Sequence, residues 1–215
     1  MKLLSINVSE PEQLEYRGRL IDTAIHKQPL SGPVMVRSLN IDGDGQANLE
    51  VHGGVHQAVY VYSSDNYDYW STELDRTDLQ YGQFGENLTV TGMPDAEIRI
   101  GDRFFAGDAE FEVTQPRAPC YKLAMKMGLP DFVLQFRASG RPRFYCKVIQ
   151  GGTICAGDTV QHEPVAGESM TIRDVFMLRY FDQDNYARIR ECAALAALAP
   201  RWRESLQKLL LKDPG

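Results

Sequence analysis

The sequence predicts a mainly β domain over residues 1–165, followed by a small all-α appendage of three helices over residues 168–215. Two observations predict this division. Short stretches rich in β-branched and aromatic residues, bounded by Gly, Asp, Asn or Pro, recur throughout the first part. In the second part, apolar residues recur at helical spacing instead. Many short strands joined by Gly-Asp turns are typical of a barrel or a sandwich with short helices between the strands.

The composition indicates an ordinary globular protein. The 215 residues are 43% hydrophobic and 24% charged, with a formal net charge of -6. This charge argues against general nucleic-acid binding, which needs a cationic surface. No apolar run reaches the roughly 18 residues that span a bilayer, and the N-terminus turns polar too soon for a secretory leader. We therefore expect a cytoplasmic protein with no membrane partner, whose four cysteines, lacking close pair spacing, are reduced.

The predicted strands are short, and short helices lie between some of them. In chain order they lie in the stretches GPVMVRSLNI (32–41), QAVYVYS (57–63), NLTVTG (87–92), AEIRIGDRFFAGDAEFEVTQ (96–115), FYCKVIQGG (144–152) and TICAGDTVQHEP (153–164).

A first helix is predicted in SSDNYDYWSTELD, residues 63–75. Ser64 or Asp65 is a suitable N-cap, since either side chain can accept a hydrogen bond from the first turn. Tyr67 and Trp70 are three residues apart and so lie on one face of this helix, which predicts that they belong to the core.

Further helices are predicted on both sides of the last strands. Residues 120–140 form two helical pieces, broken at Gly128 and Pro130. Residues 171–211 carry three helical patterns, separated by an Asp-rich break and by Pro200. A helix-turn-helix is one interpretation of this appendage. Over residues 168–215, however, 8 Lys and Arg stand against 7 Asp and Glu, a net of only +1, which disfavours DNA binding.

The stretch QPRAPCYK presents a cysteine between a strand and a helix. Pro116 and Pro119 suppress helix formation until after Cys120. Arg117 and Lys122 are close in sequence, and positive charge favours the thiolate, the form that attacks electrophiles or binds soft metals. The alternative for any isolated cysteine is a small buried hydrophobe, and we predict that role for the other three: Cys146, Cys155 and Cys192.

Histidine candidates for activating this thiol or holding a metal are few. His52 and His56 are four residues apart, but Gly53 and Gly54 make a helix that carries both on one face improbable. The glycine pair instead permits a close approach of the backbone, either to another strand or to a bound group. The preceding DGDGQAN, residues 42–48, does not continue as a calcium-binding loop, so we interpret it as a turn.

Four motifs, in this order along the chain, carry a family resemblance. They are IHKQPLSGPVMVRSLNIDGDGQANLEVHGG, HGGVHQAVYVY, YGQFGENLTVTG and IRIGDRFFAGDAEFEVTQPRAPCYKL. Together they resemble the MOSC family, the molybdenum cofactor sulfurase C-terminal domain, and the resemblance covers nearly the whole chain. The three appended helices resemble those of the YiiM-like subgroup.

The resemblance implies a β-barrel-like domain that binds the molybdenum cofactor, a pterin that carries a dithiolene and a phosphate. A cysteine at the position of Cys120 ligates molybdenum in redox-active members, and thiolate is a soft ligand suited to such a metal. Phosphate ligands would come from motif-matched polar residues, namely Lys27, Ser31, Arg37 and Arg117. The other residues expected at the cofactor are His52, Gly53, Glu86, Asn87 and Lys122.

Two qualifications accompany these assignments. Glu86 and Asn87 have an alternative role, which is to hold the FGEN turn. The sequence also departs from the subgroup's pattern at Gly45 and Asn48, where acidic residues are usual, so no role is assigned to these two positions.

Three functions are compatible with these residues. The first, which the resemblance favours, is an oxidoreductase that reduces N-hydroxylated compounds such as hydroxylaminopurine-type bases. Because the chain has no CxxC cluster and no GxGxxG fingerprint, its electrons would come from a separate flavin or iron-sulfur reductase. The second is a non-catalytic carrier of molybdenum cofactor, or of sulfur as a Cys120 persulfide. The third is an interaction protein in which the helices bind a partner.

Overall fold

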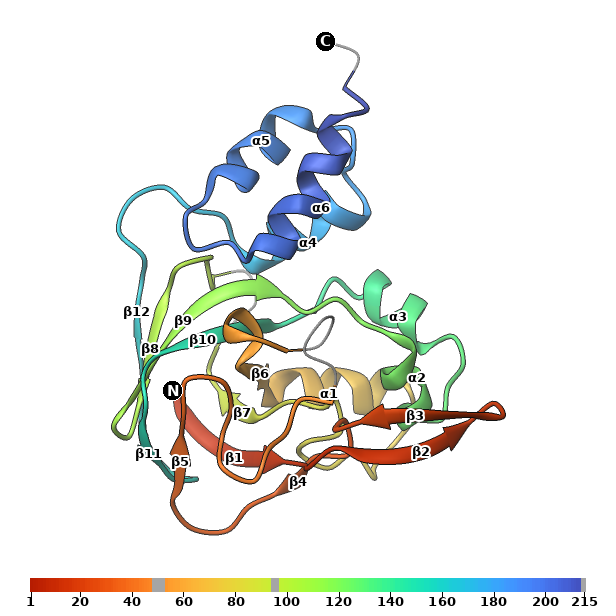
Figure 1. The fold of residues 1–215 in the computed structure, drawn as a ribbon, viewed down its shortest axis with the longest axis vertical. Helices are drawn as coiled ribbons and strands as arrows, with labels where there is room; N and C mark the ends of the chain where they lie inside the picture. Colours follow the sequence, from red (N-terminus) through yellow and green to blue (C-terminus); the bar gives the residue numbers. More distant parts are fainter. Residues whose placement is uncertain (48–52, 94–96, 214–215) are drawn as a thin grey trace.

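The computed structural model of the chain describes residues 1–47, 53–93 and 97–213. Figure 1 shows a strongly curved β structure with short helices beside it and the C-terminal helices gathered at one end. This arrangement confirms the predicted fold class. No helix in the described part of the chain is both long enough and apolar enough to cross a bilayer.

Twelve strands build the β structure of the described residues. In chain order they are β1 (Lys2–Val8), β2 (Glu12–Tyr16), β3 (Arg19–Thr23), β4 (Gln28–Pro29), β5 (Val34–Val36), β6 (Val59–Ser63), β7 (Leu88–Thr91), β8 (Arg103–Ala106), β9 (Ala109–Pro116), β10 (Phe144–Gln150), β11 (Gly152–Ile154) and β12 (Val160–Glu163).

The helices are short. In chain order they are the 3-10 helix η1 (Val55–Gln57) and the α-helices α1 (Ser64–Glu73), α2 (Tyr121–Met127), α3 (Phe132–Ala138), α4 (Ile172–Tyr180), α5 (Tyr186–Ala194) and α6 (Pro200–Leu210).

Eight strands form one mixed sheet, in the order β12-β8-β9-β10-β6-β7-β1-β4. Only β6 and β7 are parallel neighbours, and α1 provides the crossover that a parallel pair requires. The sheet curls until β1 approaches the start of β12. There the amide of Leu3 donates to the carbonyl of Asp158 at 2.9 Å, and the amide of Val160 donates to the carbonyl of Met1 at 3.0 Å. Backbone bonds therefore join the two ends of the barrel without a continuous strand ladder.

Two small sheets lie outside this order. β11 pairs with β5, and β2 pairs only with β3. The β2–β3 hairpin projects beside α2 in Figure 1, where the rings of Tyr16 and Tyr121 stack with centroids 6.1 Å apart. This hairpin thus forms one side of the region around the start of α2.

The core has two clusters on opposite sides of β6. One fills the barrel and includes Val61 and Phe144. The other is largely aromatic and is centred on Trp70, whose ring stacks on that of Phe136 at 5.9 Å. All five residues of β6 are buried, as expected of a strand covered on both faces. The prediction that Tyr67 and Trp70 belong to the core is confirmed.

The C-terminal helices pack directly on the barrel, because Phe176 and Leu206 belong to the same buried cluster as the barrel interior. The first of these helices is capped by Thr171, whose hydroxyl accepts from the amide of Asp174 at 3.0 Å. The amide of Ala199, just before α6, donates to the carbonyl of Thr114 in β9 at 3.0 Å. The three helices are therefore fixed against the strand that leads to Cys120.

The predicted helix boundaries are confirmed, with one exception. α2 ends at Gly128, whose φ of 69° is the left-handed conformation that glycine adopts readily, and α3 begins after Pro130. The N-cap of α1 is Ser63 rather than the predicted Ser64 or Asp65. Ser63 is the last residue of β6 and still has extended backbone, so the helix begins one residue earlier than the sequence pattern suggests.

Candidate functional site

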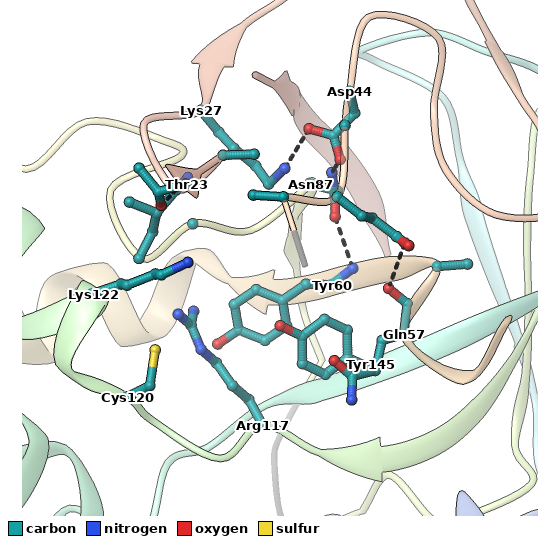
Figure 2. A pocket seen from close by; sticks show the side chains of 17 residues that line it. Thr23, Lys27, Asp44, Gln57, Tyr60, Asn87, Arg117, Cys120, Lys122 and Tyr145 are labelled. Carbon is teal, nitrogen blue, oxygen red and sulfur yellow. Dashed lines mark hydrogen bonds and ion pairs between the residues drawn. The ribbon is translucent and has the colours of Figure 1, made fainter. Parts of the chain in front are cut away.

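A pocket opens where β3, the turn at residues 44–47, η1, β6, β10 and the start of α2 meet. It encloses about 610 Å³ of space that includes open solvent. Figure 2 shows Cys120 at one side of this pocket and Gln57 at the other, with two tyrosine rings between them. Five of the predicted site residues line it: Lys27, Asn87, Arg117, Cys120 and Lys122.

Cys120 occupies the junction that the prolines predict. β9 ends at Pro116, and Cys120 is the extended N-cap residue of α2, with φ −130° and ψ 171°. The loop between them is tied to the residue before β10, since the amide of Arg117 donates to the carbonyl of Arg143 at 3.0 Å. The half-buried thiol of Cys120 is therefore held at the edge of the pocket by defined backbone.

Arg117 is a buried cation beside this thiol. It is only 6% exposed, and its guanidinium donates to the carbonyl of Phe84. The guanidinium carbon also lies 4.6 Å from the centre of the Tyr60 ring, a cation–π contact. Cys120 and Arg117 interact electrostatically. Because a neighbouring cation favours thiolate over thiol, the arrangement suits a nucleophile or a soft metal ligand.

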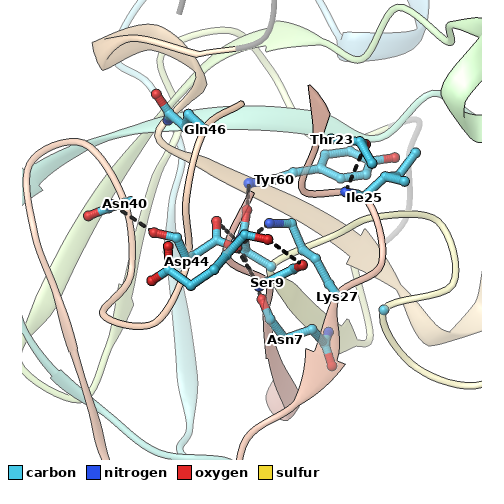
Figure 3. A network of polar contacts seen from close by, with 12 residues as sticks. Asn7, Ser9, Thr23, Ile25, Lys27, Asn40, Asp44, Gln46 and Tyr60 are labelled. Carbon is cyan, nitrogen blue, oxygen red and sulfur yellow. Dashed lines mark hydrogen bonds and ion pairs between the residues drawn. The ribbon is translucent and has the colours of Figure 1, made fainter. Parts of the chain in front are cut away.

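A buried polar network forms the wall of the pocket opposite Cys120. Lys27 forms an ion pair with Asp44, whose carboxylate also accepts from the side-chain amide of Asn87 at 2.8 Å. Asn87 in turn accepts from the amide of Tyr60 at 3.0 Å. Figure 3 shows the position of Asp44, which also accepts from the amide of Ser9. The network fixes the turn at residues 44–47 against β6.

Burial lowers the pKa of two lysines here. The pKa of Lys27 is lowered by desolvation, against the opposing attraction of Asp44. Desolvation lowers the pKa of Lys126, on α2, to about 8. Lys126 donates to the carbonyls of Ile25 at 2.8 Å and Gly82 at 2.6 Å. Lys126 therefore joins α2 to the segment that follows β3, outside the pocket lining.

Two aromatic rings form the middle of the pocket. The rings of Tyr60 on β6 and Tyr145 on β10 lie side by side, with centroids 4.9 Å apart and planes tilted by 33°. Desolvation raises the pKa of Tyr145, so its hydroxyl keeps its proton and remains a hydrogen-bond donor near neutral pH. Tyr60 is only 1% exposed and lies against the guanidinium of Arg117, so the half-buried ring of Tyr145 is the aromatic group that a heteroaromatic ligand could contact.

Lys122 contacts the β2–β3 hairpin, and three further residues predicted at the cofactor are not found in the pocket lining. Lys122 lines the pocket and donates to the carbonyl of Asp22 at 2.5 Å, which connects α2 to the β2–β3 hairpin. Ser31 and Arg37 are exposed and are not part of the lining, and Arg37 is ion-paired with Asp42 at 2.8 Å. Gly53 also lies outside the lining, and His52 falls outside the described residues.

Glu86 is fully buried and holds the turn before β7. It accepts from the amide of Gly82 at 2.7 Å, from the amide of Phe84 at 3.2 Å and from the hydroxyl of Thr89 at 2.9 Å, and it also accepts from the hydroxyl of Tyr67. These contacts are those of the turn-holding role, the alternative considered for Glu86.

The remaining cysteines differ from Cys120. Cys146 and Cys192 are buried as predicted, and desolvation raises the pKa of Cys146 and raises that of Cys192 to about 12. Cys155 is half-buried, so the prediction of a buried side chain is wrong for this residue. Within the described ranges, no three His, Cys, Asp or Glu side chains form a metal-binding group. A metal at Cys120 would therefore depend on further ligands from a cofactor.

Sequence reasoning missed Asp44, Tyr60, Tyr145 and Gln57. Asp44 belongs to the stretch interpreted as an ordinary turn, and the two tyrosines alternate with core residues in their strands. Their convergence depends on the pairing of β10 with β6, where Tyr145 lies opposite Tyr60. No local signal in the sequence specifies that register.

Comparison with known proteins agrees with this architecture. The MOSC domain profile matches residues 48–161, and the profile of the YiiM-like 3-alpha helix domain matches residues 170–213. The uncharacterized protein YflK of Bacillus subtilis (strain 168) is 37% identical over 206 residues, which covers 96% of this chain and 93% of YflK. A protein named Reductase from Gibberella moniliformis (strain M3125 / FGSC 7600) is 37% identical over 146 residues, which covers 66% of this chain and 26% of that protein.

The crystal structure of YiiM from Geobacillus stearothermophilus superposes on this fold with a TM-score of 0.82 at 32% sequence identity, and the match covers 97% of this chain and 98% of that structure. The barrel, the appended helices and these similarities lead to one assignment: the chain belongs to the MOSC domain family, in its YiiM-like form with three C-terminal helices.

Proposed function

We propose that this protein is a molybdenum-cofactor-dependent oxidoreductase that reduces N-hydroxylated compounds with electrons from a separate flavin or iron-sulfur reductase. The observation that carries the proposal is the half-buried thiol of Cys120 at the edge of an open pocket, beside the buried cation of Arg117. A relative that bears the name Reductase supports an oxidoreductase over a structural protein.

The residues of the pocket fit the chemical parts of the cofactor. Cys120 offers the soft sulfur ligand that molybdenum accepts. Arg117 and Lys122 offer charge for a phosphate, whereas Lys27 is already paired with Asp44. Tyr145, which is half-buried and lines the pocket, offers an aromatic contact for a pterin. When bound, the cofactor would supply two-electron redox chemistry.

The overall reaction balances as the cleavage of one N–O bond. The substrate R–NHOH takes up two electrons and two protons and yields R–NH2 and water, while the reductase partner is oxidised by two electrons. The chain's own part is to keep Cys120 in its thiolate form, to orient the substrate and to hold protons near the leaving oxygen. Tyr145, which keeps its proton near neutral pH, is suited to donate a hydrogen bond in the pocket.

Metal analysis of protein from a host that makes molybdenum cofactor tests the proposal. We expect about one molybdenum per wild-type chain and a marked loss in Cys120→Ser. Cys155→Ser is a matched control, because Cys155 is also half-buried but does not line the pocket. Released pterin fluorescence should follow the metal content.

The reduced, loaded protein should then be reoxidised by a hydroxylaminopurine. Molybdenum that stays bound but is not reoxidised by any N-hydroxylated compound would instead indicate a cofactor carrier. Wild-type protein that holds no molybdenum, even after addition of free cofactor, would contradict the proposal.

A further inference from the structure

The hairpin of β2 and β3 has one strand edge that the rest of the described chain leaves uncovered. β2 pairs with β3 and with no other strand among the described residues. In Figure 1, β3 lies on the side of α2, and β2 forms the outer margin of the hairpin. An exposed strand edge presents unpaired N–H and C=O groups, which can pair with another strand. The function proposed above makes no use of this edge.

The turn of the hairpin determines which backbone groups point outward. Residues 17–18 form it with φ of 52° and 72°, the left-handed conformation of a two-residue hairpin turn. The residues that flank such a turn, here Tyr16 and Arg19, exchange both of their hydrogen bonds, and bonded pairs then alternate with non-bonded pairs along the ladder. The N–H and C=O groups of Gln13 and Glu15 therefore point away from β3, at exposed positions of β2.

The opposite edge of the hairpin is tied to α2. There the outward carbonyl of Asp22 in β3 accepts from the ammonium group of Lys122 at 2.5 Å. At the base of the hairpin, the amide of Gly45 donates to the carbonyl of Ser9 at 3.0 Å. The hairpin is thus held at its base and along β3. The edge of β2 is consequently presented in a fixed conformation, which lowers the entropic cost of binding.

The charges along β2 complement one another in an antiparallel pair of copies. Glu10 and Glu12 stand at the start of the strand, whereas Arg17 and Arg19 stand at its turn, and all four are exposed. Charged residues on an edge strand usually prevent pairing. Here, however, two antiparallel copies place the acidic start of each strand beside the basic turn of the other, and opposite charges across strands are stabilising. The edge therefore favours a second copy of itself over an arbitrary strand.

The outward groups also select a register. When Leu14 of one copy lies opposite Leu14 of the other, Gln13 lies opposite Glu15, so both outward pairs exchange hydrogen bonds and no like charges are opposed. A shift of the register toward the turn opposes Glu15 to itself, which is destabilising. A shift toward the start of the strand opposes Glu15 to Pro11, which has no N–H to donate. The register centred on Leu14 avoids both problems.

We propose that the outer edge of β2 is a homodimer interface, in which a second copy of this chain adds its own β2 antiparallel about a two-fold axis. The two hairpins then form one sheet in the order β3-β2-β2-β3. Because both copies use the same edge, the contact is closed and does not extend into a fibre. A strand of 5 residues buries little surface, so the dimer is weak and forms at high protein concentration. This inference does not depend on the proposed reductase function.

Sedimentation velocity of the full chain tests the interface. Between about 5 and 500 µM, the mean mass should rise from that of one chain toward that of two chains. Gln13→Pro removes one outward N–H and leaves the ladder with β3 intact, so it should weaken dimerisation about tenfold or more. Asp22→Pro is the matched control, because it removes an outward N–H from the edge that is tied to α2 and should dimerise as the wild type does.

A charge exchange tests the complementarity. Glu10→Lys combined with Glu12→Lys makes the edge basic, and Arg17→Glu combined with Arg19→Glu makes it acidic. Each double variant alone should stay monomeric at concentrations at which the wild type dimerises, whereas their equimolar mixture should form a mixed dimer. Added salt should weaken the mixed dimer. Circular dichroism of every variant checks that it is folded.

Two results would overturn the inference. The first is a wild type that stays monomeric over this concentration range, which would leave the edge to a strand of another protein. The second is a dimer that neither Gln13→Pro nor the charge exchange changes, which would place the interface elsewhere on the molecule. The metal analysis of Cys120→Ser is independent of both results.

Discussion

The guanidinium carbon of Arg117 lies 4.6 Å from the centre of the Tyr60 ring, and Arg117 precedes Cys120 by three residues. Its charge favours the thiolate of Cys120. We predict that Arg117→Met slows the alkylation of Cys120 by iodoacetamide at pH 7 about tenfold. The reason is that an opposite charge nearby typically changes the pKa of an ionisable group by roughly 1 or more, and the thiolate is the form that reacts. Mass spectrometry of the Cys120 peptide measures the rate.

Arg117→Lys is the control for this variant, because it keeps the positive charge but loses the planar group that contacts Tyr60 and Phe84. It should retain most of the alkylation rate. Equal rates in the wild type and in a folded Arg117→Met protein would show that the cation does not activate the thiol.

The buried ion pair of Lys27 and Asp44 predicts a large loss of stability when one partner is removed. Asp44→Asn would leave the ammonium group buried and unpaired, with Lys27 only 8% exposed. We expect the free energy of unfolding to fall by about 3–5 kcal/mol. Urea denaturation measures it, and Lys27→Met combined with Asp44→Asn should recover part of the loss. An Asp44→Asn protein as stable as the wild type would contradict this account.

Because Lys126 is largely buried, we predict that it makes the free energy of unfolding increase as the pH rises. Burial lowers the pKa of Lys126 to about 8, from an ordinary value of 10.5 in the unfolded chain. Between these values the unfolded state binds more protons, so raising the pH favours the folded state. From pH 8 to pH 10 the wild type should gain about 2 kcal/mol relative to Lys126→Met. Urea midpoints at pH 8, 9 and 10 measure this difference, and parallel curves for the two proteins would refute it.

Because Glu86 accepts a hydrogen bond from Tyr67, we predict that the losses of stability caused by changing these two residues are not additive. In Glu86→Gln, one of the two acceptor oxygens becomes a donor group, which then faces either the amide of Gly82 or that of Phe84. We expect the variant to lose about 2–3 kcal/mol in the free energy of unfolding, the cost of hydrogen bonds to a buried charged group. Tyr67→Phe should lose less, and the double variant should lose less than the sum of the two because both changes break the same hydrogen bond. Additive losses would count against the shared contact.

Features fixed by local chemistry were predictable from the sequence. The break between α2 and α3 follows from Gly128 and Pro130, and the position of Cys120 between a strand and a helix follows from the prolines beside it. The aromatic core was also predictable, since Trp70 lies on one face of a short helix. Each of these inferences needs only neighbouring residues.

Features fixed by long-range pairing were not predictable in the same way. Arg37 and Lys27 were both candidates from one motif, yet only Lys27 faces the pocket, because Arg37 lies in a turn that pairs it with Asp42 on the surface. Tyr145 reaches the pocket through the register of β10 against β6. Which side of a loop or strand faces the pocket is decided by partners far away in the sequence.

The seam of the barrel has a consequence for the order in which the molecule forms during synthesis. Strand β1 has β7 along one edge, whereas its other edge meets β4 at its end and, at its start, needs the backbone of residues 158 and 160 as a second neighbour. The ribosome therefore releases the first strand long before its second neighbour exists, and contacts so distant in sequence form slowly. The pocket around Cys120 is consequently assembled late, when the last strand has been made and the helices that rest on β9 are about to follow.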